Sequence, residues 1–332
     1  MRQILNKLFD YETLNATEAG ELFRGIAQGK YNDSQIASLM TVYLMRNISL
    51  EELAGFKTAL MEFSRDVDFG THKFIDIVGT GGDGKDTFNI SSCSSFVVAG
   101  AGYKVVKHGN IAASSVSGAS NVIEQHGVKF TNDMSILTRS LDESNIAYLH
   151  APMFNTAMKA VAGVRRDMGV RSFFNMLGPL INPSRPQYQL LGVYNLAMQR
   201  MYCYMLQHQQ TDFAVVHALD GYDEISLTSD FKVSTSQGEK IYTPESLGFA
   251  RITDATTLSS GDTLESAAKI FDAVLGGTAT KEQRECVVAN SAFAIQVLNP
   301  TKSIEECIAE AKESIDSGKS LAALKKFVTI NS

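Results

Sequence analysis

One stretch of this chain decides its fold: Phe74-Ile-Asp-Ile-Val-Gly-Thr-Gly-Gly-Asp-Gly-Lys-Asp-Thr-Phe-Asn-Ile-Ser-Ser92. Its apolar beginning, residues 74–78, predicts a buried strand, and the small apolar segment 93–101 predicts the helix that packs on it. The loop between them is rich in glycine, which leaves its backbone N–H groups unhindered, and Thr, Asn and Ser close it. Because free amides and the helix dipole both attract negative charge at a helix N-terminus, we expect this loop to bind phosphate.

The dinucleotide-binding motif G-x-G-x-x-G fits the loop only in part. Gly79, Gly81 and Gly84 have the required spacing. The motif also needs an acidic residue after the next strand, where it binds the ribose hydroxyls of NAD. The next predicted strand, 103–107, ends instead in Lys107, whose positive charge suits another phosphate group. NAD binding and a dehydrogenase activity are therefore disfavoured.

The P-loop motif G-x-x-x-x-G-K-[ST] also fits only in part. Gly79, Gly84 and Lys85 match it, but Asp86 stands where a hydroxyl residue would bind magnesium. A carboxylate at that position would repel the phosphates of a nucleotide. The alternative without any ligand is a glycine-rich turn that only links a strand to a helix.

Composition and charge exclude several classes of partner. The chain has 332 residues, enough for one large domain and a smaller one. Its formal net charge of −6 at pH 7 gives no general attraction to nucleic acid or to a membrane, and we expect neither as a partner. The four cysteines lie far apart and the first residues lack an apolar leader, so we expect a cytoplasmic protein with reduced thiols.

The predicted secondary structure changes near residue 70. Before it we predict only helices, at 3–9, 17–29, 33–46 and 50–64. Asn15 with Glu18, and Ser49 with Glu52, have the spacing of capping boxes at two of their starts.

After residue 70, strands alternate with helices, which is typical of a mainly parallel sheet with both faces covered. Strands are predicted at 74–78, 103–107, 146–150, 188–194 and 213–219, with an antiparallel appendage of polar strands within 231–252. Helices are predicted at 91–101, 117–126, 133–142, 153–168, 196–209, 262–276, 281–298 and 303–327.

Polar residues follow the carboxyl ends of these strands, where open α/β sheets bind ligands. The second strand ends in Lys107-His-Gly-Asn110, and the small residues after it, 112–117, include several hydroxyls. The fifth strand leads to Asp223-Glu224. An isolated Asp-Glu pair is more often a solvated turn, but magnesium is commonly bound by one or two carboxylates together with substrate phosphates. We therefore predict a metal site at Asp223-Glu224.

Five motifs of the chain occur together in one known family. They are Gly79-Thr-Gly-Gly-Asp83, Asn89-Ile-Ser-Ser92, Lys107-His-Gly-Asn110, Phe174-Asn-Met-Leu-Gly-Pro-Leu-Ile-Asn-Pro183 and Asp223-Glu224. In this order and spacing the chain resembles the anthranilate phosphoribosyltransferases of the tryptophan pathway over its whole length. The resemblance implies an α-helical domain at 1–70, joined by part of 153–182, and an α/β domain at 71–332 with a central, mainly parallel sheet flanked by helices. It also implies a homodimer.

The resemblance implies the reaction as well. The 5-phosphoribosyl group of phosphoribosyl pyrophosphate (PRPP) would pass to the amine of anthranilate, with inversion at ribose carbon 1 and release of pyrophosphate. Magnesium would be the cofactor, with two ions per subunit. The aromatic amine is already neutral at pH 7, so no general base is required, and no catalytic side chain is assigned.

Site residues follow from the matched motifs. The resemblance assigns PRPP binding to Gly79, Gly82, Asp83, Thr87, Asn89, Ile90, Ser91, Ser92, Lys107, His108, Gly109, Asn110, Ile111, Ala112, Ala113, Ser114 and Ser115. It assigns anthranilate to Gly79, Asn110 and Arg165, with Arg165 at the carboxylate, and magnesium to Ser91, Asp223 and Glu224. The residues alone support the loop, Lys107 and the acidic pair, but they do not favour Arg165 over Arg166 or Arg171.

Four positions depart from the family pattern. Ile111 stands where a basic residue is common, and Ala119 where a serine often contacts PRPP. Asn155-Thr156 replaces a frequent His-Pro, and Gly163 a frequent proline. The first two changes remove side-chain groups from the PRPP end, and the other two fall at the anthranilate end.

Two related functions remain as alternatives. A pyrimidine nucleoside phosphorylase shares the fold, but its usual Lys-His-Ser-Thr-Gly-Gly signature is absent. A non-catalytic relative that binds nucleic acid would need a basic groove, which the net charge of −6 does not support.

Overall fold

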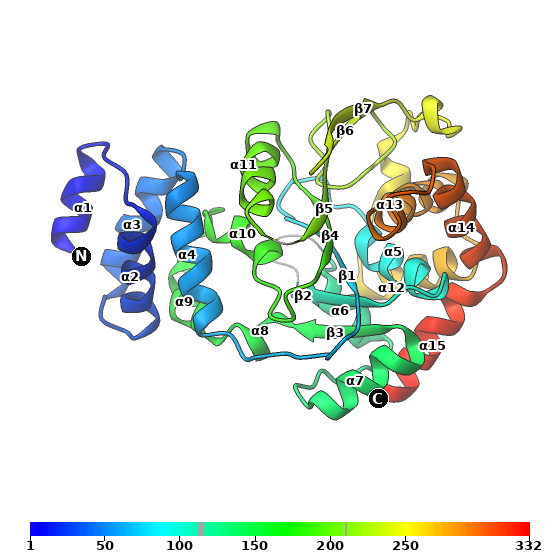
Figure 1. Cartoon of the computed structure of the whole chain (residues 1–332), viewed down its shortest axis with the longest axis horizontal. Helices are drawn as coiled ribbons and strands as arrows, with labels where there is room; N and C mark the ends of the chain where they lie inside the picture. The colour runs from blue at the N-terminus through cyan, green and yellow to red at the C-terminus, as the bar shows by residue number, and fades with distance from the viewer. Residues whose placement is uncertain (112–115, 210) are drawn as a thin grey trace. The chain divides into compact units, whose positions relative to one another are not determined.

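The computed structural model describes residues 1–111, 116–209 and 211–332 (Figure 1). The chain folds into two compact units, one made of residues 1–67 and 151–185 and the other of residues 68–150 and 186–332. The four predicted PRPP-binding residues Ala112, Ala113, Ser114 and Ser115 lie outside the described residues. No helix within the described ranges is both long enough and apolar enough to cross a membrane.

The first unit is entirely helical. Its elements are α1 (Arg2–Phe9), α2 (Ala16–Ala27), α3 (Asp33–Met45), α4 (Leu50–Glu62), α8 (Ala151–Phe154), η1 (Thr156–Met158), α9 (Lys159–Met168), α10 (Phe174–Leu177) and η2 (Gly178–Leu180). Both predicted capping boxes are present, at Asn15 with Glu18 and at Ser49 with Glu52. The four N-terminal helices thus begin and end close to where the sequence predicts them.

Glu52 organises the interior of this unit. Its carboxylate is fully buried and accepts hydrogen bonds from the Leu14 N–H at 2.9 Å and the Ser49 N–H at 2.8 Å. The Tyr43 hydroxyl and the Arg46 guanidinium donate to it as well, at 3.1 and 2.6 Å. Because both oxygens of this buried charge are paired, the desolvation cost is offset, and the connection between α1 and α2 is held to α3 and α4.

The predicted helix 153–168 is wrong as a single element. It breaks at Asn155, whose backbone leaves the helical region at φ −99° and ψ 65°. The side-chain Nδ2 of Asn155 donates to the Ile181 backbone carbonyl, and the side-chain Oδ1 of Asn155 accepts from the Ser64 hydroxyl. A side chain that bonds distant partners in this way competes with helix continuation, and periodicity cannot reveal it.

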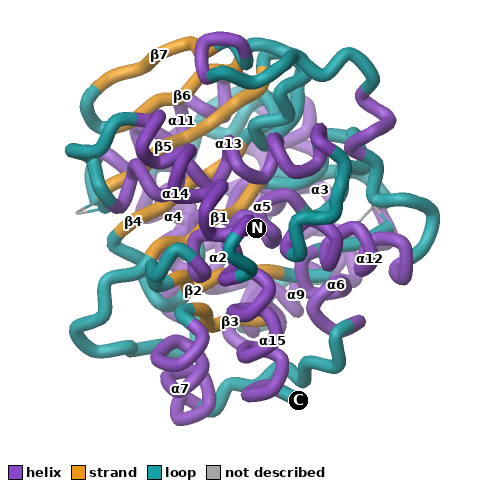
Figure 2. Tube along the Cα trace, turned by 90° about the vertical axis from the view of Figure 1, so that its right-hand side faces the viewer, coloured by secondary structure: helices purple, strands orange, loops and turns teal. Residues whose placement is uncertain are grey.

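The second unit is built on a seven-stranded sheet in the order β3-β2-β1-β4-β5-β6-β7. The strands are β1 (Ile75–Gly79), β2 (Val105–Gly109), β3 (Ile146–His150), β4 (Tyr188–Gly192), β5 (Asp212–Ala218), β6 (Phe231–Thr235) and β7 (Gly238–Tyr242). Strands β1 to β5 are parallel, and β6 and β7 are antiparallel. Figure 2 shows the strands stacked from β7 to β3. The predicted α/β class and antiparallel appendage are confirmed.

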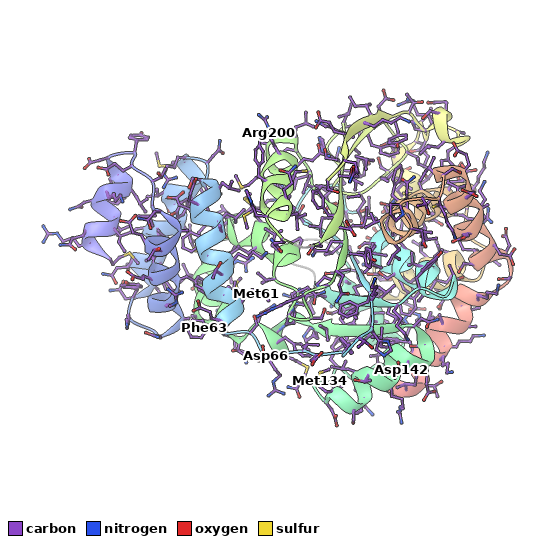
Figure 3. The ribbon with its side chains drawn as sticks, in the orientation of Figure 1. Met61, Phe63, Asp66, Met134, Asp142 and Arg200 are labelled. Atoms are coloured by element: carbon purple, nitrogen blue, oxygen red, sulfur yellow. The ribbon has the colours of Figure 1, made fainter. Side chains whose placement is uncertain are left out.

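Helices cover both faces of this sheet. They are α5 (Ile90–Gly100), α6 (Ala119–Gln125), α7 (Met134–Ser144), α11 (Leu196–Gln207), η3 (Glu245–Leu247), η4 (Ala255–Leu258), α12 (Leu264–Leu275), α13 (Lys281–Leu298), α14 (Ile304–Asp316) and α15 (Lys319–Asn331). Figure 1 shows α5 and α13 on one side of the strands and α11 on the other. In the view with side chains, Arg200 marks α11, and Asp142 marks α7, which packs on β3 (Figure 3).

The predicted helix 303–327 is also wrong as a single element. The chain ends α14 at Asp316 and begins α15 at Lys319. Gly318 between them has φ +75°, a left-handed conformation that a glycine adopts without strain.

The strand order places the site. Strands β1, β2 and β3 lie on one side and β4 and β5 on the other, so the order reverses between β1 and β4. In open α/β sheets, ligands bind at such a switch point, outside the carboxyl ends of the strands. The glycine loop leaves β1 at this point, because Gly79 pairs with Gly192 at the end of β4.

Candidate active site

The glycine loop has a backbone that only its own residue types allow. Gly81, Gly82 and Gly84 all lie in the left-handed region, at φ +66°, +74° and +79°. A side chain at these positions would be strained, so the glycines are needed for conformation as well as for access. Between them, the Asp83 carboxylate accepts from the Lys85 N–H at 3.1 Å and tightens the turn.

The acidic pair reaches this loop from the segment after β5. The Gly81 N–H donates to the Asp223 carboxylate at 2.6 Å. The Ser91 N–H, in the first turn of α5, donates to the Glu224 carboxylate at 2.9 Å. The structure therefore brings together the loop, the start of α5 and both carboxylates. It also shows that Glu224 engages one of the amides that the sequence predicts for PRPP.

Burial and neighbouring carboxylates raise the proton affinity of both members of the acidic pair. Asp223 is buried, and burial together with the charges of Glu224 and Asp83 raises its pKa well above the usual range. Burial also raises the pKa of Glu224 to about 7, although hydrogen bonds from Ser91 and the charge of Lys107 oppose this shift. Negative charges held this close favour a bound cation, which would relieve their repulsion.

Unpaired polar atoms in the same place support a ligand site. The Asp83 Oδ2 and Ser92 Oγ atoms are buried and have no hydrogen-bond partner among the described residues. The described residues contain no closed cluster of three or more His, Cys, Asp or Glu side chains that would hold a metal alone. A hard cation here would need water and substrate phosphate as further ligands, as magnesium usually has. The donor set of hydroxyl and carboxylate oxygens fits magnesium.

Lys107 lies beneath the site. Its side chain is 1% exposed, and its ammonium donates to the Ile77 carbonyl at 2.6 Å and to the Ser91 hydroxyl at 3.3 Å. Burial lowers the Lys107 pKa, while the charges of Asp76 and Glu224 raise it. The ammonium thus supports the first turn of α5 and faces the acidic pair. Direct contact between Lys107 and a substrate phosphate stays a prediction.

Sequence reasoning missed two residues of the site. Asp76, fully buried in β1, accepts from the His108 N–H at 3.3 Å and faces Lys107. Gly192 lies so close to the Asp223 backbone carbonyl that a Cβ atom there would overlap it. The signals were a charge inside an apolar strand and a glycine at a strand end, which often marks a close backbone approach.

The remaining predicted PRPP residues surround this centre. Thr87 forms an isolated bridge with Ser259. Asn89 stands at the N-cap of α5, and its amide donates to the Ser117 carbonyl at 3.1 Å. Ile90 is fully buried at the start of α5, whereas Ile111 is 53% exposed. Thr87 and Asn89 thus attach the end of the loop to the segments that carry Ser259 and Ser117.

Asn110 follows the last residue of β2. Its side-chain oxygen accepts from the Ile111 N–H at 2.8 Å. The Asn110 amide nitrogen has no hydrogen-bond partner among the described residues. Two free N–H donors of this kind suit a carboxylate or a phosphate oxygen.

Arg165 belongs to the helical unit, on α9. Its guanidinium lies over the Phe174 ring at 5.9 Å and donates weakly to the Asn175 side chain at 3.4 Å. Burial lowers its pKa, and no carboxylate pairs with it among the described residues. Arg166, by contrast, has an 81% exposed side chain and pairs with Asp167. A half-buried cation without an acidic partner is the better candidate for an anionic ligand.

Both units match known families. Residues 2–64 match the family described as "Glycosyl transferase family, helical bundle domain", and residues 71–321 match "Glycosyl transferase family, a/b domain". The anthranilate phosphoribosyltransferase of Bacteroides thetaiotaomicron is 63% identical over 331 residues, which cover 100% of this chain and 99% of that protein.

Solved structures agree with the sequence relatives. The crystal structure of anthranilate phosphoribosyltransferase from Thermus thermophilus has a TM-score of 0.90 at 30% identity, with 98% of each chain covered. The Saccharomyces cerevisiae enzyme in complex with PRPP and Mg has a TM-score of 0.90 at 26% identity, covering 98% of this chain and 96% of that one. Sequence, fold and full-length coverage together show that this chain belongs to the anthranilate phosphoribosyltransferase family.

Proposed function

We propose that the carboxyl edge of the sheet, where the Gly79 loop meets Asp223 and Glu224, is where this chain performs its family's reaction. As an anthranilate phosphoribosyltransferase it transfers the 5-phosphoribosyl group from PRPP to the amine of anthranilate, in tryptophan biosynthesis. One observation carries the location: the glycine loop and the first turn of α5 donate backbone N–H groups to two buried carboxylates with raised pKa values. A phosphate ligand and a cation together would satisfy both features.

The chain's own residues would work mainly by positioning. The loop amides and the α5 N-terminus would hold the phosphates of PRPP and leave ribose carbon 1 open to attack. The neutral amine of anthranilate would attack from the face opposite to the departing pyrophosphate, which inverts that carbon. Magnesium would be held by the Asp223 and Glu224 carboxylates and the Ser91 hydroxyl. We propose two magnesium ions per subunit. When bound, magnesium would stabilise the charge on the departing pyrophosphate.

Magnesium has support from a relative. The yeast enzyme in complex with PRPP and Mg is 26% identical to this chain and shares its fold. Membership of this family also argues against the two alternative functions, a nucleoside phosphorylase and a non-catalytic nucleic-acid-binding protein.

The decisive test mixes the protein with anthranilate, PRPP and magnesium and follows the loss of anthranilate fluorescence. The chain contains no tryptophan, so protein emission interferes little. We expect rapid loss of signal, none with EDTA, and release of pyrophosphate in equal amount. Phosphate-dependent cleavage of uridine or thymidine, with no use of anthranilate, would contradict the proposal.

Arg165 is proposed to bind the carboxylate of anthranilate. A guanidinium can hold a carboxylate with two parallel hydrogen bonds, whereas an ammonium cannot. Arg165→Ala should therefore raise the anthranilate KM by about 10- to 150-fold, and Arg165→Lys should recover only part of the loss. The PRPP KM should stay within about twofold. Steady-state kinetics with each substrate varied in turn decide this.

The matched control is Arg166→Ala, which removes the exposed neighbour of Arg165. It should leave both Michaelis constants near those of the parent chain. Equal effects of the two substitutions, or no effect of either, would move the carboxylate site to another residue, with Arg171 the next candidate.

A homodimer is proposed through the helical unit. Four large apolar side chains are exposed at the ends of α1 and α3: Phe9, Tyr11, Leu44 and Met45. These helix ends are neighbours, because the Arg46 guanidinium reaches the Glu12 carbonyl at 3.5 Å. Single exposed apolar residues are ordinary, but a group of them indicates an interface.

A cytoplasmic location is also proposed, because all four cysteines are free thiols.

Charged substitutions test the dimer. Phe9→Glu combined with Met45→Glu should halve the mass measured by sedimentation velocity, because each buries a charge in the proposed interface. Ile241→Glu, at an equally exposed position on β7, is the control and should leave the mass unchanged. A parent chain that sediments as a monomer at micromolar concentration would overturn this proposal.

A further inference from the structure

A buried serine is bonded to the backbone of Asn110. Ser120, the second residue of α6, is fully buried, and its N–H donates to the Asn110 carbonyl at 3.0 Å. Asn110 is therefore attached to α6 through its backbone, while its side-chain amide stays unpaired among the described residues. A shift of Ser120 would therefore move the backbone from which the Asn110 side chain extends.

Two side chains of β3 hold the Ser120 hydroxyl. Its Oγ atom lies 2.9 Å from the Tyr148 hydroxyl and 2.8 Å from His150 Nδ1. Burial lowers the His150 pKa and favours the neutral imidazole, and in the tautomer that carries its proton on Nε2 the Nδ1 atom accepts from Ser120. Tyr148 can then donate to Ser120, and the three groups form one continuous chain of hydrogen bonds.

An aromatic ring fixes the two β3 side chains. The Phe130 ring stacks on His150 with centroids 4.4 Å apart and an angle of 6°, and on Tyr148 at 5.2 Å and 24°. The stack leaves the imidazole little freedom to turn away from Ser120. Ser120, Tyr148, His150 and Phe130 are called the β3 cluster below.

The β3 cluster also supports the residue before Asn110. The Tyr148 hydroxyl occupies the space that a Cβ atom of Gly109 would fill, so the phenol lies directly against this backbone. Gly109 pairs with His150 in the register of β2 and β3. The end of β2 is thus held from below by Tyr148 and from α6 by Ser120, at the point where the chain turns into Asn110.

We propose that Ser120, held by Tyr148 and His150, is a positioning residue for the acceptor substrate and acts through Asn110. The inference rests on the proposed role of Asn110 in binding anthranilate. Ser120 itself is fully buried and touches no substrate. Its task is to keep Asn110 in the position from which its side-chain amide binds anthranilate. The family pattern places a serine that often contacts PRPP at position 119, which is alanine here, so Ser120 stands one position after that serine.

The first test is kinetic. Ser120→Ala removes the hydroxyl and leaves the Tyr148 and His150 polar atoms without their partner. We expect the anthranilate KM to rise by about 5- to 30-fold, while the PRPP KM stays within about twofold. Equal rises in both Michaelis constants would indicate a general loss of structure and would overturn the inference.

An isosteric pair tests the same contact without altering α6. Asparagine places a polar atom near the position of Nδ1, and leucine has the same shape without one. His150→Asn should hold the anthranilate KM within about threefold of the parent value, and His150→Leu should raise it as Ser120→Ala does. Both variants lose the Phe130 stack, so a difference between them reports the hydrogen bond alone. Identical values for the two variants would overturn the inference.

A double-mutant cycle separates this inference from the proposed function. If Ser120 acts through Asn110, then Ser120→Ala should have little further effect on the anthranilate KM in an Asn110→Ala background. Additive effects would overturn the inference alone and leave the role of Asn110 intact. An unchanged anthranilate KM in Asn110→Ala itself would overturn the Asn110 assignment, and the inference with it.

Discussion

Asp223→Asn should lower kcat/KM for PRPP by at least about 100-fold, the usual effect of losing one preorganised group that acts on charge in the transition state. Asparagine has the shape of aspartate, so its side-chain oxygen can still accept from the Gly81 N–H. The substitution therefore removes the charge and leaves the loop bonded. The magnesium concentration needed for half-maximal rate should rise as well, because one anionic oxygen ligand is lost.

The control for Asp223→Asn lies in the same turn. Asp220 is exposed and accepts from the Thr228 and Ser229 hydroxyls. Asp220→Asn should leave kcat/KM within about threefold of the parent value. Initial rates at several magnesium concentrations compare the two variants. A loss of less than about fivefold in Asp223→Asn would remove this carboxylate from the metal site.

Glu224→Gln should make the protein more stable while it destroys activity. The Glu224 pKa is about 7 in the folded chain, above the usual value of a glutamate, so the folded state holds a proton that the unfolded state releases. Stability from this group is therefore present at low pH and is lost as the pH rises to about 7. At pH 8 in EDTA the glutamine variant should melt roughly 2 °C or more above the parent.

The pH dependence supplies the check on that result. Near pH 4 both side chains are neutral, and the melting temperatures of Glu224→Gln and the parent should converge. Glu12→Gln, at an exposed position in the helical unit, should not alter the melting temperature at either pH. A lower melting temperature for Glu224→Gln at pH 8 would mean that the carboxylate is stabilised by its neighbours in the absence of metal.

The parts of the fold that sequence predicts well are those set by local pattern. The strands β1 to β5 follow apolar runs, and their predicted positions agree with the structure within about two residues. The helices that were wrong break where one residue acts non-locally or adopts an unusual backbone. Asn155 bonds to Ser64 and Ile181, far away in sequence, and Gly318 has φ +75°. Periodicity continues through both positions and cannot show the break.

The candidate site divides in the same way. The glycine loop and the acidic pair could be predicted to converge, because parallel strands bring their carboxyl ends to one edge. The direction of the Lys107 side chain could not be predicted, since it depends on which neighbouring group accepts a hydrogen bond from its ammonium. Here that group is the Ile77 carbonyl, at 2.6 Å. The need for Gly192 is likewise invisible without the Asp223 backbone that approaches it.

Gly192→Ala, which adds a single methyl group to the second unit, should strongly reduce both activity and stability. A Cβ atom at Gly192 would overlap the carbonyl oxygen of Asp223, so one of the two backbones has to move. Strand β4 is held on both sides, with Gly192 in register with Gly79 and Val216, and its carbonyl accepts from the Thr80 N–H at 2.9 Å. The segment that carries Asp223 must therefore shift, and the carboxylate leaves the position from which it meets Gly81.

This displacement should appear in activity and in stability together. A shift of about 1 Å in a positioning group commonly costs about 100-fold in rate, so kcat/KM should fall by that factor. Overpacking of a tight contact costs about 1–3 kcal/mol, which for a chain of this length corresponds to a melting temperature lower by roughly 1–5 °C. Gly163→Ala is the control, because Gly163 lies inside helix α9 and no atom of the other described residues lies within 4 Å of the added carbon. Its melting temperature should stay level or rise slightly, since alanine restricts the unfolded chain. Gly192→Ala could instead match this control in rate and melting temperature. Asp223 would then have room to move, and the close packing of β4 against the acidic pair would not be what positions the metal site.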